Sequence, residues 1–83
     1  MPARKTRFDV ADMVDKLNGA LIFRDAPYRY KSHSENGSMV LDKYNLQGGC
    51  IESTVRGVST GEMYRIVKAT WDILTDNTFA RNQ

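Results

Sequence analysis

The stretch Tyr28–Tyr44, YRYKSHSENGSMVLDKY, decides the fold of this 83-residue chain. Two β-prone runs flank Asn36-Gly37, and an Asn-Gly pair between such runs is the strongest short-range signal for a two-residue hairpin loop. A loop centred on this pair fixes the register of the two strands, so that His33 faces Val40 across the hairpin. The sequence therefore predicts an antiparallel pair of strands near 28–34 and 38–44.

The two faces of this hairpin differ in character because side chains alternate along a strand. The first face is apolar and carries Tyr28, Tyr30, Met39 and Leu41. The second face is mostly polar and carries Arg29, Lys31, His33, Glu35, Val40, Asp42 and Tyr44. We expect the apolar face to lie against helices and the polar face to meet solvent.

A third β-like run, CIESTVRGV, follows the turn residues NLQGG and extends the sheet near 50–56. Pairing Tyr44 with Cys50 predicts two further pairs across these strands, Met39 with Val55 and Lys43 with Ile51. Ile51 and Val55 then join the apolar face. The polar face gains Cys50, Glu52, Thr54 and Arg56.

Two amphipathic segments flank the strands. The first is expected over 10–18, with Asp9 as its N-cap, Phe8 and Met13 as a hydrophobic staple, and Gly19 as its stop. The second is expected over 60–75, capped by Ser59 or Thr60. Between the first helix and the hairpin, ALIFRD (20–25) is either a short strand or an extended lead-in.

The order of these elements predicts an α+β domain: a helix, a three- or four-stranded antiparallel sheet and a helix, with both helices on one face of the sheet. The strand count depends on whether 20–25 pairs as a strand. The expected core is Val10, Val14, Leu17, Met39, Leu41, Ile51, Val55, Ile66, Val67 and Leu74.

The length allows one domain, expected over 8–78, with a C-terminal tail over 79–83. Arg4, Lys5 and Arg7 concentrate positive charge in an N-terminal tail over 1–7. The other nine basic and ten acidic side chains leave the rest of the chain near −1. A folded surface dominated by basic charge is therefore not indicated.

The single cysteine, Cys50, excludes an internal disulfide and suits a reducing cytoplasm. The N-terminal residues lack the apolar run of a secretory signal, and no stretch reaches the length of a membrane span. One histidine and one cysteine do not make a usual zinc site, and LQGGC lacks the spacing of a phosphate loop. No metal or cofactor is expected.

His33, the only histidine, is the obvious candidate for acid–base chemistry. Its place in the hairpin register puts it on the polar face, where Asp42 could orient it. A catalytic histidine also needs a group that holds substrate and stabilises charge. Only Lys31 and Arg56 are placed to do so, and carboxylates crowd the same face. We therefore expect no catalytic residue.

The helix–strands–helix order resembles the topology of double-stranded-RNA-binding domains, and it is similar to the small HicA-type RNase toxins built on that topology. The first resemblance implies a lysine cluster opening the last helix, where this chain has STGEMYR. The second implies a catalytic histidine in a glycine-containing strand motif. YKSHSENG has a histidine on a strand before a turn but lacks the preceding glycine.

Two functional hypotheses follow. The first is a non-enzymatic protein-binding module, an adaptor or an inhibitor that blocks a larger complex, of the kind often encoded by phages or mobile elements. The second is an RNA-binding or RNA-cleaving domain that uses Lys31, His33 and the basic tail. The candidate binding residues are Arg29, Lys31, His33, Asp42, Tyr44, Glu52, Arg56, Tyr64 and Trp71.

Overall fold

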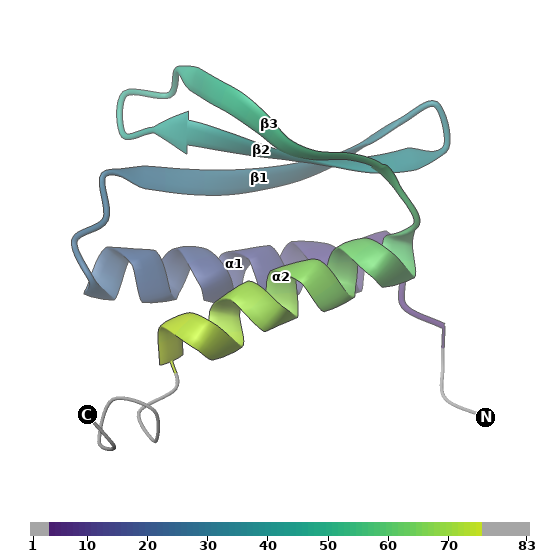
Figure 1. The fold of residues 1–83 in the computed structure, drawn as a ribbon, viewed down its shortest axis with the longest axis horizontal. Helices are drawn as coiled ribbons and strands as arrows, with labels where there is room; N and C mark the ends of the chain where they lie inside the picture. The colour runs from purple at the N-terminus through teal and green to yellow at the C-terminus, as the bar shows by residue number, and fades with distance from the viewer. Residues whose placement is uncertain (1–3, 76–83) are drawn as a thin grey trace.

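The computed structural model describes residues 4–75 of the chain. Its elements, in order, are α1 (Arg7–Phe23), β1 (Tyr28–Glu35), β2 (Ser38–Asn45), β3 (Cys50–Val58) and α2 (Thr60–Thr75). The strands form one antiparallel sheet in the order β1-β2-β3. Figure 1 shows this sheet as one layer and both helices as a second layer on one of its faces. The predicted α+β class is confirmed.

The β1–β2 hairpin has the predicted loop and register. Asn36 and Gly37 both have positive φ, 52° and 82°, as a type I′ turn requires. His33 lies opposite Val40 and Lys31 lies opposite Asp42, so every expected pair of this hairpin is present. The Asn-Gly turn alone was enough to set which side chains share a face.

The β2–β3 register differs from the prediction. Tyr44 faces Cys50 as expected, but Lys43 faces Glu52 instead of Ile51. Extra residues in β3 cause three register irregularities, and each one breaks the simple alternation of faces.

The same bulges shift the β3 side chains relative to the core. Met39 faces Val58, and Val55 lies opposite Leu41. Ile51, predicted to be core, is 53% exposed.

Helix α1 is longer than predicted at both ends. Thr6, not Asp9, is the N-cap, because the two residues form a capping box: Asp9 N–H donates to Thr6 Oγ1 at 3.2 Å, and Thr6 N–H donates to Asp9 Oδ2 at 2.7 Å. Phe8 is 82% exposed, so the expected hydrophobic staple is absent. Arg7, assigned to the tail from the sequence, is the first residue of the helix.

The C-terminal extension of α1 passes through Gly19, so the expected stop at this glycine is wrong. Leu21 continues the buried stripe one turn beyond Leu17. Burying a leucine side chain is worth about 1.5–3 kcal/mol, which exceeds the roughly 1 kcal/mol cost of a helical glycine. Most of ALIFRD is therefore the last turn of α1 and forms no fourth strand. The helix ends where Asp25 adopts a positive φ of 56°.

The core lies between the sheet and the helices. α1 packs against β1, α2 packs against β2, and the helices pack against each other. The predicted core residues that are buried are Val10, Val14, Leu17, Met39, Leu41 and Val67. Val55, Ile66 and Leu74 are only half-buried. The buried apolar residues that the prediction missed are Met13, Leu21, Tyr30, Val40 and Met63.

The second helix matches its predicted span of 60–75. Ser59 accepts a hydrogen bond from the Glu62 N–H at 3.1 Å, so Ser59 is its cap. The predicted C-terminal tail, 79–83, lies outside the described residues.

Candidate functional site

The face of the sheet that points away from the helices is uncovered within residues 4–75 (Figure 1). We call it the open sheet face. It comprises Lys31, His33, Glu35, Val40, Asp42, Tyr44, Ser53 and Arg56. All three strands contribute to it.

Five of these residues form a closed cycle of polar contacts, which we call the polar ring: His33, Glu35, Asp42, Ser53 and Arg56. His33 Nδ1 lies 3.3 Å from Asp42 Oδ2, and its Nε2 lies 3.5 Å from Glu35 Oε2. Ser53 Oγ donates to Asp42 Oδ1 at 2.7 Å. Arg56 closes the ring by donating to Ser53 Oγ at 3.1 Å and to both carboxylate oxygens of Glu35 at 3.0 and 3.2 Å.

The centre of the open sheet face is occupied by β2. Asp42 is only 6% exposed and Val40 only 2%, although Val40 is not part of the core cluster beneath the sheet. A carboxylate that loses water needs replacement partners. The Ser53 hydroxyl and the His33 ring supply them, so the ring holds β1 and β3 against the central strand.

The charged groups of the polar ring contact one another. The hydrogen bonds from Arg56 are the main reason that the pKa of Glu35 lies below its usual value, and the His33 contact adds to this effect. Lys31 lies beside the ring with its Nζ 5.2 Å from the centre of the Tyr44 ring. The open sheet face therefore presents the paired charges of the polar ring together with the Lys31 ammonium group over Tyr44.

The ring geometry does not match a nucleophile–base pair. Ser53 donates its proton to Asp42 and makes no hydrogen bond with His33. Both ring nitrogens of His33 face carboxylates, Glu35 on one side and Asp42 on the other. Neither nitrogen is directed at a hydroxyl that it could deprotonate.

The structure brings together five of the predicted binding residues: Lys31, His33, Asp42, Tyr44 and Arg56. Arg29 lies opposite Tyr44 at the end of the same face, and its guanidinium donates to the backbone carbonyls of Ala26 and Tyr28 at 2.8 and 2.6 Å.

Glu52, Tyr64 and Trp71 lie elsewhere. Glu52 lies opposite Lys43, whose Nζ is 3.9 Å from its carboxylate, on the helix-facing side of the sheet. Tyr64 and Trp71 are half-buried on α2, against the core.

Ser53 is the polar ring residue that sequence reasoning missed. Strict alternation from the Tyr44–Cys50 pair puts position 53 on the apolar side. The irregularity between Lys43 and Tyr44 shifts the phase of β3, so that Ser53 faces Asp42. The alternation of apolar and polar residues along a strand does not reveal a bulge, and the sequence carried no separate signal for one.

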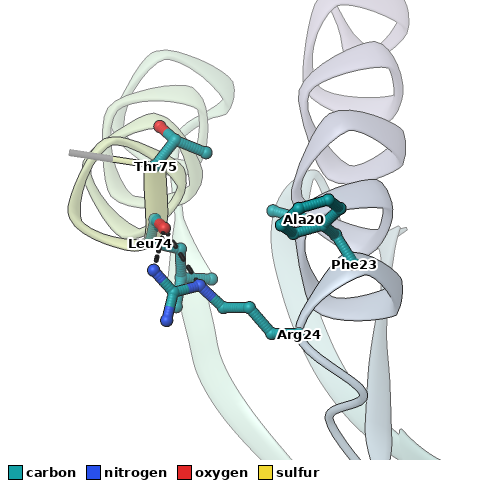
Figure 2. Close-up of a pocket in the computed structure, with 5 residues that line it drawn as sticks. All are labelled: Ala20, Phe23, Arg24, Leu74 and Thr75. Carbon is teal, nitrogen blue, oxygen red and sulfur yellow. Dashed lines mark hydrogen bonds between the residues drawn. The ribbon is translucent and has the colours of Figure 1, made fainter. Parts of the chain in front are cut away.

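A second candidate is the hollow of about 440 Å³ between the C-terminal ends of α1 and α2, lined by Ala20, Phe23, Arg24, Leu74 and Thr75. Figure 2 shows Arg24 reaching from the end of α1 to the last turn of α2, where its guanidinium donates to the Leu74 carbonyl oxygen. This contact satisfies a carbonyl that the helix end leaves open. Arg24, the one charged group among the described residues that line the hollow, is therefore used for capping.

Within residues 4–75, no cluster of three histidine, cysteine or acidic side chains could hold a metal ion. The same residues contain no helix with the length and hydropathy needed to cross a membrane. Cys50 is an exposed, free cysteine.

Comparison with known proteins adds no further assignment, since no family model, curated protein or solved structure matches this chain.

Proposed function

We propose that the chain is a small, non-enzymatic protein-binding module that uses the open sheet face as its binding surface. The observation that carries this proposal is the pairing of polar groups in the ring: the Arg56 guanidinium and the His33 ring each already contact a carboxylate. Mixed, ordered charges suit a protein partner, for which they give orientation and specificity. A phosphate backbone is better met by unpaired cations.

The rest of the molecule supports the same interpretation. Leu46 and Ile51 expose apolar side chains near the β2–β3 turn, beside Tyr44 and Cys50 on the sheet. Protein interfaces combine apolar and aromatic contacts with polar ones. An adaptor or inhibitor binds its partner through such a surface and needs no catalytic group. If a phage or mobile element encodes the chain, the expected partner is a larger complex that loses activity on binding.

The test is affinity capture with two charge-reversed variants. Arg56→Glu alters the open sheet face, and Arg65→Glu makes the same charge change on the exposed side of α2. We expect the wild type and Arg65→Glu to retain the same protein, and Arg56→Glu to lose most of it while its circular dichroism stays unchanged. Equal retention by both variants would count against the open sheet face.

The alternative function is binding or cleavage of RNA through Lys31 and His33. One observation favours it: both residues lie on the open sheet face, where an extended strand of RNA could reach them. The test is an RNA cleavage and gel-shift assay with the wild type and His33→Ala. Cleavage that disappears in a folded His33→Ala variant would replace the protein-binding proposal. Absence of both activities in the wild type would remove the alternative.

A further inference from the structure

The free edge of β1 differs from the free edge of β3. β1 is eight residues long and pairs with β2 without a single irregularity. β3, the other edge of the sheet, carries the three register irregularities described above. Bulges protect an edge strand against pairing with another chain, and β1 has none.

The hairpin geometry determines which backbone groups of β1 point outward. Next to a two-residue loop, Glu35 and Ser38 form a hydrogen-bonded pair, and such pairs alternate along the strands with pairs that share no hydrogen bond. The N–H and C=O groups of residues 28, 30, 32 and 34 therefore point away from β2, towards the free edge.

Two of these four positions are already occupied. The Asn18 side chain, from α1, donates to the Tyr30 carbonyl at 2.9 Å and accepts from the Tyr30 N–H at 2.8 Å. The Tyr28 carbonyl accepts from Arg29 at 2.6 Å. Within residues 4–75, no such contact reaches the outward groups of Ser32 and Ser34.

We infer that the free edge of β1 pairs with β1 of a second copy of this chain, antiparallel, with Ser32 of each copy opposite Ser34 of the other. This register uses all the outward groups of Ser32 and Ser34 and gives four hydrogen bonds. Shifting it to place Ser34 opposite Tyr30 would require breaking the Asn18 contacts. The Asn18 side chain therefore selects the register.

Charge complementarity supports a second copy as the occupant. With Ser32 opposite Ser34, Lys31 of each copy lies opposite Glu35 of the other, on the open sheet face. Opposite charges on directly facing residues stabilise a strand pair. Both side chains are exposed in the single chain, and in the pair Lys31 of the other copy would approach Glu35 beside Arg56. The two-fold axis passes between the two His33 residues.

The side of the edge that faces the helices is also suited to this pairing. A hollow beside Ser32 and Ser34 is lined by Phe8, Ala11 and Met39, with Arg7 and His33 at the same place. Phe8 is the exposed aromatic residue that had no role in the helix cap. The two-fold symmetry brings the Phe8 side chains of the two copies to this place, where they can be buried. The resulting six-stranded sheet would join the open sheet faces of the two copies. This dimer does not depend on the proposed function.

The decisive experiment exchanges charge between copies. Lys31→Glu places a carboxylate opposite Glu35 of the other copy, and Glu35→Lys places an ammonium group opposite Lys31, so each variant alone meets like charges twice. Mixed together, the two variants form two opposite-charge pairs. We expect sedimentation equilibrium at low salt to show a wild-type dimer, a dissociation constant raised roughly tenfold or more for each variant alone, and restored affinity for the mixture.

Amide exchange locates the interface independently of these variants. The Ser32 and Ser34 amides should become protected as the wild-type concentration rises, because they have no hydrogen-bond partner among residues 4–75 of the single chain. Ser32→Pro removes one of these donors at an edge position that proline tolerates, and it should weaken the dimer more than Ser32→Ala does. A wild type that stays monomeric at millimolar concentration overturns the inference. A dimer in which these two amides stay unprotected also overturns it, because such a dimer forms through another surface. Binding of only a different protein at the β1 edge overturns it as well.

Discussion

Arg56 on β3 reaches across the central strand and binds both carboxylate oxygens of Glu35 on β1, at 3.0 and 3.2 Å. The two outer strands are thereby linked over the open sheet face, although they share no backbone hydrogen bonds. This contact completes the polar ring and holds in place the charges on which the proposed function rests.

The pH dependence of Glu35 tests this contact. Because the Arg56 hydrogen bonds lower the pKa of Glu35 below its usual value of 4.5, the ionised carboxylate favours the folded state. Its contribution to stability is present above about pH 4.5 and is lost as the pH falls through the lowered pKa of the folded chain. An NMR titration should find the Glu35 pKa raised towards 4.5 in Arg56→Ala and unchanged in Arg65→Ala. A Glu35 pKa that does not respond to Arg56→Ala would show that the contact is absent in solution.

The N-terminal cap of α1 makes a second prediction. Thr6→Ala removes the side chain that accepts from the Asp9 N–H, and it should lower the free energy of unfolding by about 1 kcal/mol. Thr54→Ala, at an exposed position of β3, is the control and should change it little. Urea unfolding of both variants measures the difference. The hydrogen bond from the Thr6 N–H also lowers the pKa of Asp9, so the capping box should weaken as the pH falls through that lowered value.

The core makes a third prediction, in which burial ranks three apolar residues. Leu41 is buried, Ile66 is half-buried and Ile51 is exposed. Leu41→Ala should cost about 2–5 kcal/mol of stability, Ile66→Ala less, and Ile51→Ala close to nothing. Thermal and urea unfolding provide the comparison. A large loss of stability in Ile51→Ala would mean that β3 pairs with β2 in the register predicted from the sequence, with Ile51 buried.

The Asn18 side chain makes a fourth prediction. Asn18→Ala leaves the N–H and C=O groups of Tyr30 without their partner, at a part-buried site, and should destabilise the chain by about 1–3 kcal/mol. Lys16→Ala, on the exposed side of the same helix, is the matched control. Faster exchange of the Tyr30 amide in Asn18→Ala, and not in Lys16→Ala, would identify the contact directly. Equal stability of both variants would contradict it.

The sequence predicted the parts of the fold that depend on local chemistry. Asn36-Gly37 set the β1–β2 register, and Ser59 with the apolar stripe that follows it set the bounds of α2. Those signals lie within a few residues of the structure they determine. The residues of the polar ring that come from β1 and β2 were placed on the correct face for the same reason.

The errors came from tertiary packing. Gly19 is typical of a helix stop, but burial of Leu21 carries α1 past it. Alternation predicted Ile51 to be buried, but the bulges of β3 place it near solvent and bring Ser53 to Asp42. These outcomes depend on which long-range contacts a residue gains, and a local pattern does not contain that information.

The measurement that tests the central claim most directly is photo-crosslinking from both layers of the molecule. p-Benzoylphenylalanine is placed at Tyr44, on the open sheet face, or at Phe23, which is 91% exposed at the end of α1. Cells expressing each form are irradiated, and the adducts are digested with protease or with RNase. We predict a protease-sensitive adduct to a different protein at position 44 and none at position 23. An adduct that forms only at position 23, or one at position 44 that RNase removes, would contradict a protein-binding open sheet face.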